Sequence, residues 1–179
     1  MKGIVFTEFL KMVEDKFGYE TVDKIITESK VPNDGAYSAV GTYDHTELVS
    51  MVIALHQSSG IPIPDLIKVY GNYFFGVLRD NYGVFLDRVD NLFDFFGSIH
   101  DHIHVEVKKL YPDAELPAFA IESASENQMV MVYTSQRKLG DFALGLMEEA
   151  AKHYNEDVTI EKSMLAEDGS EVRFVITKK

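Results

Sequence analysis

The stretch VTIEKSMLAEDGSEVRFVITKK, residues 158–179, decides the fold class, because two alternating segments flank a turn. Apolar and polar residues alternate from 158 to 165 and again from 171 to 179, and the turn residues EDGS lie between them. Alternation with a period of two is typical of half-buried strands, and a short turn between two such strands indicates a hairpin. The chain is therefore predicted to end in an antiparallel pair of strands.

Two further strand-like segments and one helix precede this hairpin. PAFAIESA (117–124) and QMVMVYTS (128–135) alternate or run apolar, whereas residues 138–155 carry an apolar face at helical spacing. That face consists of Leu139, Phe142, Ala143, Leu146, Met147 and Ala150. Four strands with a single inserted helix predict an antiparallel sheet, since a doubly wound parallel sheet requires regular strand–helix alternation.

The first part of the chain is predicted to be helical. Apolar residues at helical spacing follow the N-terminus until Gly18, and a short second helix is expected over residues 21–29. Residues 31–44 are rich in turn formers and are expected to form a loop. Asp44 and Glu47 have the spacing of a capping box, which indicates the start of a third helix that ends at the sequence SSG.

The segment IPIPDL marks the boundary between two lobes. Pro62 interrupts the helical pattern, and Pro64 suits the first turn of the next helix. We therefore predict a single α+β domain over the whole chain. It consists of a helical N-terminal lobe (1–63) and a C-terminal lobe (64–179), which stays helical to about Leu110 before the strands begin.

Composition excludes several classes of protein. The 179 residues include 17 basic and 29 acidic side chains, a net charge of -12, which argues against binding to nucleic acid or to an anionic membrane surface. There is no cysteine, so disulfides, thiolate metal sites and cysteine nucleophiles are excluded. Without a signal-peptide pattern or an apolar run of roughly 20 residues, the chain is expected to be soluble and cytoplasmic.

Three of the six histidines are clustered in the sequence SIHDHIHVEV. On a strand, His100, His102 and His104 would share a face and could bind zinc together. On a helix, which the flanking apolar spacing favours, only His100 and His104 share a face. His104 lies beside Ile103 and Val107 and follows a phenylalanine-rich helix, and burying an imidazole there is costly without a partner. A metal with an open position, or a large flat apolar cofactor, would satisfy it.

A second group of polar residues follows the strand 128–135. In an extended chain, Tyr133, Ser135 and Arg137 project to the same side. Two hydroxyls and a guanidinium fork form a clamp suited to carboxylates rather than to a nucleotide phosphate, and no glycine-rich phosphate loop is present.

The sequence contains no motif of an enzyme centre: it has neither GxSxG nor a cysteine nucleophile. The chain is therefore expected not to be an enzyme. Two alternative functions stay open: a zinc-binding protein that uses the three clustered histidines, and a helical interaction module whose phenylalanines only form a core.

Taken together, these motifs resemble the H-NOX (haem–nitric oxide/oxygen binding) family, which includes bacterial stand-alone sensors and the haem domain of soluble guanylate cyclase beta subunits. His104, Pro117 thirteen positions later and the pattern Tyr133-x-Ser135-x-Arg137 carry the resemblance. Four longer stretches also resemble the corresponding parts of the family: MKGIVFTEFL, YGNYFF, LYPDAELPAF and LGDFALGLMEEAAKHYNEDVTIEK. The resemblance therefore covers essentially the whole chain. It implies the H-NOX fold, with haem held between the two lobes.

The resemblance also implies a role for each of these residues. His104 would be the proximal ligand of a protohaem (haem b) iron, with His100, one turn earlier, as the competing candidate. Tyr133, Ser135 and Arg137 would hold the haem propionates, and Pro117 would press on the macrocycle and help to distort it. The remaining cofactor contacts expected from the resemblance are Val5, Phe9, Phe74, Phe142 and Leu146.

The distal residues imply which gas is bound. Oxygen-binding members of the family place a tyrosine donor at the position of Phe142, with polar support at the positions of Phe9 and Phe74. Because no donor is evident here, we expect a nitric oxide sensor that excludes oxygen and binds carbon monoxide more weakly.

The resemblance further implies how the sensor would signal. Nitric oxide would release His104 and shift the lobes, and the shift would be read by a separate histidine kinase or cyclic-di-GMP enzyme. A cysteine-based zinc site, which some relatives carry in the C-terminal part, is excluded here by the absence of cysteine.

Overall fold

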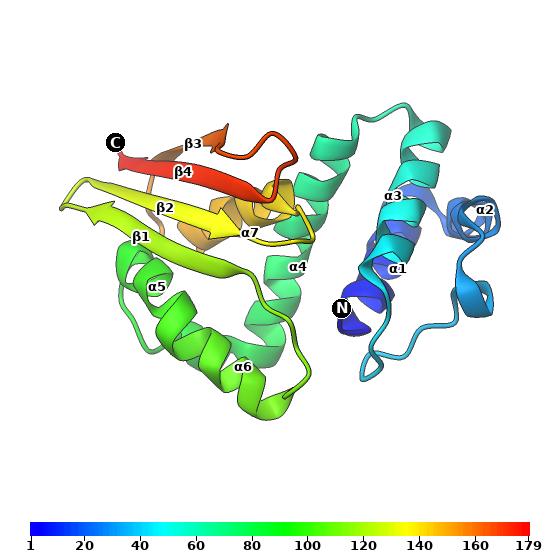
Figure 1. The fold of residues 1–179 in the computed structure, drawn as a ribbon, viewed down its shortest axis with the longest axis horizontal. Coiled ribbons are helices and arrows are strands. Elements are labelled where there is room, and N and C mark those ends of the chain that lie inside the picture. The colour runs from blue at the N-terminus through cyan, green and yellow to red at the C-terminus, as the bar shows by residue number, and fades with distance from the viewer.

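Three helices form the N-terminal end of the molecule. The computed structural model describes the backbone of residues 1–179 and every side chain except those of Asn33 and Leu110. The helices are α1 (Ile4–Phe17), α2 (Tyr19–Ser29) and α3 (His45–Ser59), and Figure 1 shows them grouped at the end of the molecule opposite the sheet. Gly18, whose φ is 85°, allows the sharp turn from α1 into α2, as its position in the sequence predicted.

The loop before α3 is tied to the start of the chain. It contains the short 3₁₀ helix η1 (Pro32–Gly35), and an isolated antiparallel bridge joins Lys2 to Thr42. The side chain of Asp44 caps α3 by accepting a hydrogen bond from the Thr46 amide at 2.9 Å. Glu47 does not complete the predicted capping box, because its carboxylate accepts a hydrogen bond from the Tyr37 hydroxyl instead.

The predicted helical region up to residue 110 consists of several segments of different geometry. A long helix, α4 (Ile63–Leu86), begins with Pro64 in its first turn, as expected, and has non-helical backbone angles at Tyr82. Then follow α5 (Leu92–Ser98), the π-helical segment η2 (Ile99–Ile103) and α6 (His104–Leu110), which run on without a break. The π-helical turn was not predicted, because hydrophobic spacing does not distinguish it from an α-helix.

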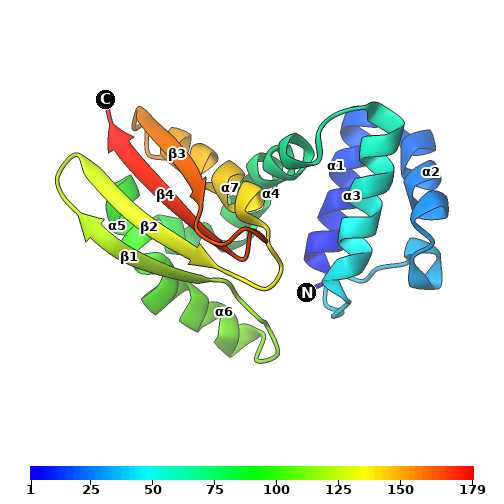
Figure 2. The same ribbon diagram turned by 45° about the horizontal axis from the view of Figure 1, so that its top comes forward.

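The second half of the chain forms a four-stranded antiparallel sheet with α7 (Gly140–His153) across one face. Its strands are β1 (Ala118–Ala124), β2 (Gln128–Thr134), β3 (Val158–Met164) and β4 (Glu171–Lys178), in the spatial order β1-β2-β4-β3. The terminal hairpin β3–β4 is confirmed, and β4 also pairs with β2. The α+β fold predicted from the sequence is therefore confirmed, with the sheet at one end of the molecule (Figure 2).

Two hydrophobic cores meet where α4 crosses α7. One is built from α1, α2, α3 and the N-terminal half of α4, and the other from α5, α7 and the inner face of the sheet. The crossing is close because glycines face each other there. A Cβ atom on Gly71 would lie 2.2 Å from the Phe142 carbonyl oxygen, and one on Gly145 would lie 2.1 Å from that of Lys68.

Candidate functional site

A largely apolar cavity of about 780 Å³ lies between the N-terminal helices and the rest of the chain. Its volume is in the range of cofactor and ligand pockets, roughly 300–1,000 Å³. Most of the residues predicted to bind the cofactor line this cavity, namely Val5, Phe74, His104, Pro117, Tyr133, Ser135, Arg137, Phe142 and Leu146. Phe9 is absent from the lining, so the structure brings together all the predicted residues but one.

Two histidines line this cavity, His45 at the start of α3 and His104 at the start of α6, and of the three clustered histidines only His104 does so. It begins α6, directly after the π-helical segment, and its ring lies 6.0 Å from that of Phe119 on β1. His104 is half-buried, whereas His100 and His102 are exposed. The arrangement favours His104 over His100 as the residue that faces a bound group.

The environment of His104 keeps its ring neutral. Burial, with smaller contributions from His100 and Lys108, lowers the pKa of His104 to about 4, although a hydrogen bond to the Pro117 backbone carbonyl opposes this shift. A neutral imidazole has a free nitrogen lone pair, which is what a metal ion requires of a histidine ligand. The Pro117 carbonyl lies beside the His104 ring, in the place that a second-layer group takes at many metal sites.

The three clamp residues converge at the mouth of the cavity, but not by strand alternation as predicted. Strand β2 ends at Thr134, and the chain then turns, so that the Ser135 hydroxyl accepts a hydrogen bond from the Arg137 amide at 3.2 Å. The Tyr133 hydroxyl accepts one from the Leu139 amide at 3.1 Å. Burial raises the pKa of Tyr133, which keeps its phenol protonated and able to donate.

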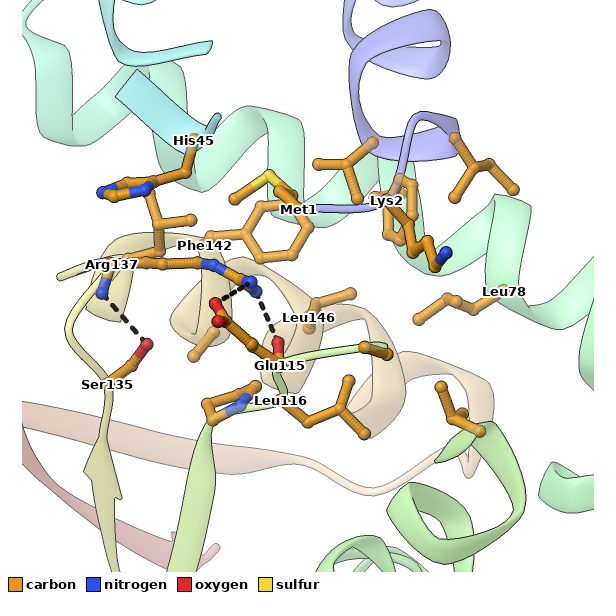
Figure 3. Close-up of a pocket in the computed structure, with 18 of the residues that line it drawn as sticks. Met1, Lys2, His45, Leu78, Glu115, Leu116, Ser135, Arg137, Phe142 and Leu146 are labelled. Atoms are coloured by element: carbon orange, nitrogen blue, oxygen red, sulfur yellow. Dashed lines mark hydrogen bonds and ion pairs between the residues drawn. The ribbon is translucent and has the colours of Figure 1, made fainter. Parts of the chain in front are cut away.

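Glu115, which sequence reasoning missed, orients the guanidinium of Arg137. Arg137 donates to the Glu115 backbone carbonyl at 2.6 Å and pairs with its carboxylate at 3.1 Å (Figure 3). The Arg137 side chain is 16% exposed, whereas that of Glu115 is 87% exposed. Because a guanidinium has five N–H donors, Arg137 keeps donors free for a further carboxylate.

The distal wall consists of interlocked aromatic and aliphatic side chains. Phe74 and Phe142 lie with ring centroids 5.5 Å apart, and Tyr70 lies 5.1 Å from Phe142. Val5 from α1 and Leu146 from α7 also line the cavity. The crossing at Gly71 and Gly145 brings α4 and α7 close enough for these rings to meet.

Tyr70 takes the place on this wall that the sequence analysis gave to Phe9. Phe9 is fully buried behind Tyr70, with the two rings edge to face at 5.3 Å. The hydroxyl of Tyr70 donates to the backbone carbonyl of Val5 at 2.5 Å. Tyr70 was not predicted as a site residue because helical spacing alone marks it as a core residue. Its hydroxyl proton points at the backbone instead of into the cavity.

The histidine cluster does not form a metal site. Over the side chains that the structure describes, no group of three or more His, Asp or Glu residues is placed to bind a metal ion. His100 and His102 are exposed, whereas His104 is half-buried and lines the cavity. The zinc site with three histidine ligands is therefore not supported.

Most of the chain, including residues that line this cavity, is similar to one known protein family. The model of the family described as "Haem-NO-binding" matches residues 2–162. The chain belongs to the Haem-NO-binding family. Membership makes the protein a haem-binding gas-sensor domain, and the H-NOX fold expected from the sequence is confirmed.

Solved structures of the same family are similar over the full chain. The Fe(II) unliganded H-NOX protein from K. algicida is 44% identical, covers 100% of this chain and 97% of its own, and has a TM-score of 0.97. The H-NOX from Shewanella woodyi, bound to IWP-051 in the Fe(II)CO ligation state, is 36% identical, with coverage of 100% and 95% and a TM-score of 0.84.

Among curated proteins, the chain is similar to the soluble guanylate cyclase gcy-33 of Caenorhabditis elegans. The two are 24% identical over 181 residues, which are 99% of this chain and 19% of the cyclase. The chain thus spans about a fifth of that relative's length. No helix in the described part of the chain is both long and apolar enough to cross a bilayer.

The side chains of this Haem-NO-binding domain fit haem. A porphyrin needs a flat apolar cavity, an axial ligand for the iron and partners for two propionates. The cavity has apolar walls, His104 presents a neutral imidazole suited to an axial position, and Tyr133, Ser135 and Arg137 offer donors suited to carboxylates.

Proposed function

We propose that this domain senses nitric oxide at ferrous haem b and excludes oxygen. His104 would be the proximal ligand, Pro117 would press on the macrocycle, and Tyr133, Ser135 and Arg137 would hold the propionates. Noncovalent protohaem is favoured because a chain without cysteine cannot form the thioether bonds of c-type haem. When bound, ferrous haem supplies an open coordination position for a diatomic gas.

The observation that carries gas selectivity is the distal wall. Of the side chains that the structure describes there, Val5, Phe74, Phe142 and Leu146 have no hydrogen-bond donor, and the hydroxyl of Tyr70 is directed at the Val5 carbonyl. Oxygen takes up negative charge from ferrous iron and needs a donor to stabilise it, whereas nitric oxide binds strongly without one. Carbon monoxide is expected to bind more weakly than nitric oxide.

Signalling would begin on the proximal side. Release of His104 would free the segment from α5 to α6, and the N-terminal lobe (1–63) would then shift against the C-terminal lobe (64–179). A ligand shifts such an equilibrium only by its difference in affinity for the two arrangements, so both must be close in energy. We propose a cytoplasmic sensor without catalytic activity, whose signal passes to a histidine kinase or a cyclic-di-GMP enzyme.

The test is a comparison of gases on the reduced, haem-loaded protein. We expect the Soret band to shift when nitric oxide is added. We expect the ferrous protein to form no stable oxygen complex in air. Phe142→Tyr places a phenol on the distal wall and should slow oxygen dissociation about tenfold or more relative to Phe142→Leu, which adds no donor, since one hydrogen bond to a charged group is worth about 1.5–3 kcal/mol. A wild-type protein that holds oxygen stably in air would contradict the proposed selectivity.

A further inference from the structure

Tyr111 lies at the end of the segment that carries His104 and connects it to two other parts of the fold. Its amide closes the last turn of α6 on the Val107 carbonyl at 2.8 Å, and its carbonyl accepts a hydrogen bond from the Ala114 amide at 2.9 Å. Its hydroxyl lies 3.3 Å from that of Tyr82, the residue with non-helical angles in α4. Tyr111 therefore moves with α6 and touches α4 at its irregular turn.

Lys2, in the N-terminal lobe, contacts the ring face of Tyr111. Its ammonium lies 5.3 Å from the centre of the Tyr111 ring, within the range of a cation–π contact. The same ammonium donates to the Thr42 hydroxyl at 3.0 Å, and the backbones of Lys2 and Thr42 form the isolated bridge. Figure 3 shows Lys2 at the cavity together with Glu115 and Leu116, which follow α6.

The backbone around Lys2 is held firmly to the N-terminal lobe. The Gly3 amide donates to the Gly41 carbonyl, and the Tyr43 amide donates to the Met1 carbonyl, both at 2.9 Å. At Gly3 there is no space for a side chain, since a Cβ atom would lie 1.8 Å from the Ser38 carbonyl oxygen. A displacement of Lys2 is therefore passed to the loop that leads into α3.

A second set of contacts joins α1 to α4 away from Tyr111. The Tyr70 hydroxyl donates to the Val5 carbonyl at 2.5 Å, and the Tyr73 hydroxyl donates to the Glu8 carboxylate at 3.2 Å, one turn further along α1. These tyrosines sit on the packed part of α4, at the first hydrophobic core. The N-terminal lobe is thus fixed to α4 by hydrogen bonds and touches α6 through Lys2 and Tyr111.

We propose that Lys2 and Tyr111 are positioning residues that pass a displacement of the His104 segment to the N-terminal lobe, a proposal that rests on the proposed function. The hydrogen bonds from Tyr70 to Val5 and from Tyr73 to Glu8 act as the hinge about which the lobe turns. Movement of α6 carries the Tyr111 ring with it, and the ammonium of Lys2, attached to Thr42, follows.

Hydrogen exchange on the haem-loaded ferrous protein tests this relay. His104→Gly with added imidazole keeps a ligand for the iron while α6 is no longer attached to it. We expect His104→Gly with imidazole to speed amide exchange in residues 38–43 about threefold relative to the wild type. In a chain that also carries Lys2→Gln or Tyr111→Leu, the same substitution should not change that exchange rate. Tyr111→Phe, which keeps the ring for Lys2, should restore the response, and Lys16→Gln, on the exposed end of α1, should not alter it.

The outcomes separate the relay from the function on which it rests. A wild-type chain that shows no Soret band after reconstitution refutes the proposed function and the relay together. A haem-loaded chain whose residues 38–43 respond equally with and without Lys2, or do not respond to the loss of His104 at all, refutes the relay alone. Loss of the response in Tyr111→Phe as well as in Tyr111→Leu would show that the ring contact with Lys2 does not carry it.

Discussion

The distal and proximal walls of the cavity are built in opposite ways. The distal wall joins regular parts of α1, α4 and α7, fixed by the glycine crossing and by rings in mutual contact. The proximal wall is a run of short segments, α5, η2 and α6, with a half-buried His104 and exposed His100 and His102. The wall proposed to select the gas is a crossing of long helices. The wall proposed to hold the iron is a series of short segments, in which side chains of α5 are buried and those of η2 are not.

This difference follows from packing density. Closely packed helices resist displacement, because any shift opens a void or forces a clash. A π-helical turn is rare and is often found at functional sites. Substitutions on the two walls should therefore have different consequences, and four of them would break or sharpen the contrast.

The largest effect is expected at His104. His104→Gly removes the one protein ligand that we assign to the iron, so haem dissociation should speed by about tenfold or more, since one metal ligand contributes well over 1.4 kcal/mol. Transfer of haem to a scavenging apoprotein measures the rate, and added imidazole should restore the ferrous spectrum. His100→Gly is the matched control. If His100→Gly lost haem faster and was rescued by imidazole, and His104→Gly was not affected, the ligand would be His100 and the assignment of His104 would be wrong.

On the distal wall, Gly71→Ala should destabilise the protein. The new Cβ atom would meet the Phe142 carbonyl oxygen at 2.2 Å and push α7 away from α4. Overpacking of this kind costs about 1–3 kcal/mol in the free energy of unfolding, measured by urea denaturation. Gly76→Ala, on the same helix with nothing within 4 Å of the added atom, should be neutral or stabilising. Equal effects at the two glycines would show that the crossing is not tightly packed.

The proximal segment is anchored at its start by Glu156, which gives a third prediction. Its carboxylate accepts a hydrogen bond from the Leu92 amide at 2.9 Å and pairs with Lys178 at 2.7 Å. Although burial opposes it, these partners lower the pKa of Glu156. Glu156→Gln should reduce the free energy of unfolding by about 1–2 kcal/mol. Glu167→Gln, in the exposed β3–β4 turn, should have little effect, and a similar loss there would mean that the anchor is not specific.

The smallest effect is expected at Glu115. Glu115→Gln weakens the pair that orients Arg137, and because Glu115 is exposed, the contribution is about 0.2–1 kcal/mol. Haem dissociation should speed by up to about fivefold, since 1.4 kcal/mol corresponds to a factor of ten. Asp113→Asn, at the same mouth of the cavity, is the control. Slower dissociation in Glu115→Gln would mean that the carboxylate competes with the propionates for Arg137.

The sequence predicted elements whose signals are local. The hairpin that ends the chain, the helix end at Gly18 and the start of α4 at Pro64 each follow from alternation, a glycine or a proline at the required position. The apolar neighbours of His104 indicated an imidazole that needs a partner, and its choice over His100 came from the resemblance to the H-NOX family. The clamp was predicted from residue types, although its convergence arises from a turn after Thr134 and not from an extended strand.

Contacts between distant parts of the chain were beyond sequence reasoning. The bond from Tyr70 to Val5 joins residues 65 positions apart, and helical spacing gives no sign that this hydroxyl is engaged. The contact of Lys2 with Tyr111 depends on how the lobes meet, and the π-helical turn before His104 has the same apolar spacing as an α-helix. In each case the determining factor is packing between elements.

The absorption spectrum of the reduced, haem-reconstituted protein tests the central claim most directly. The account predicts a strong Soret band that changes position with His104→Gly, is restored by imidazole and shifts when nitric oxide is added, whereas air produces no stable oxygen complex. A colourless protein that folds fully without haem, or a stable oxygen form of the wild type, would contradict it.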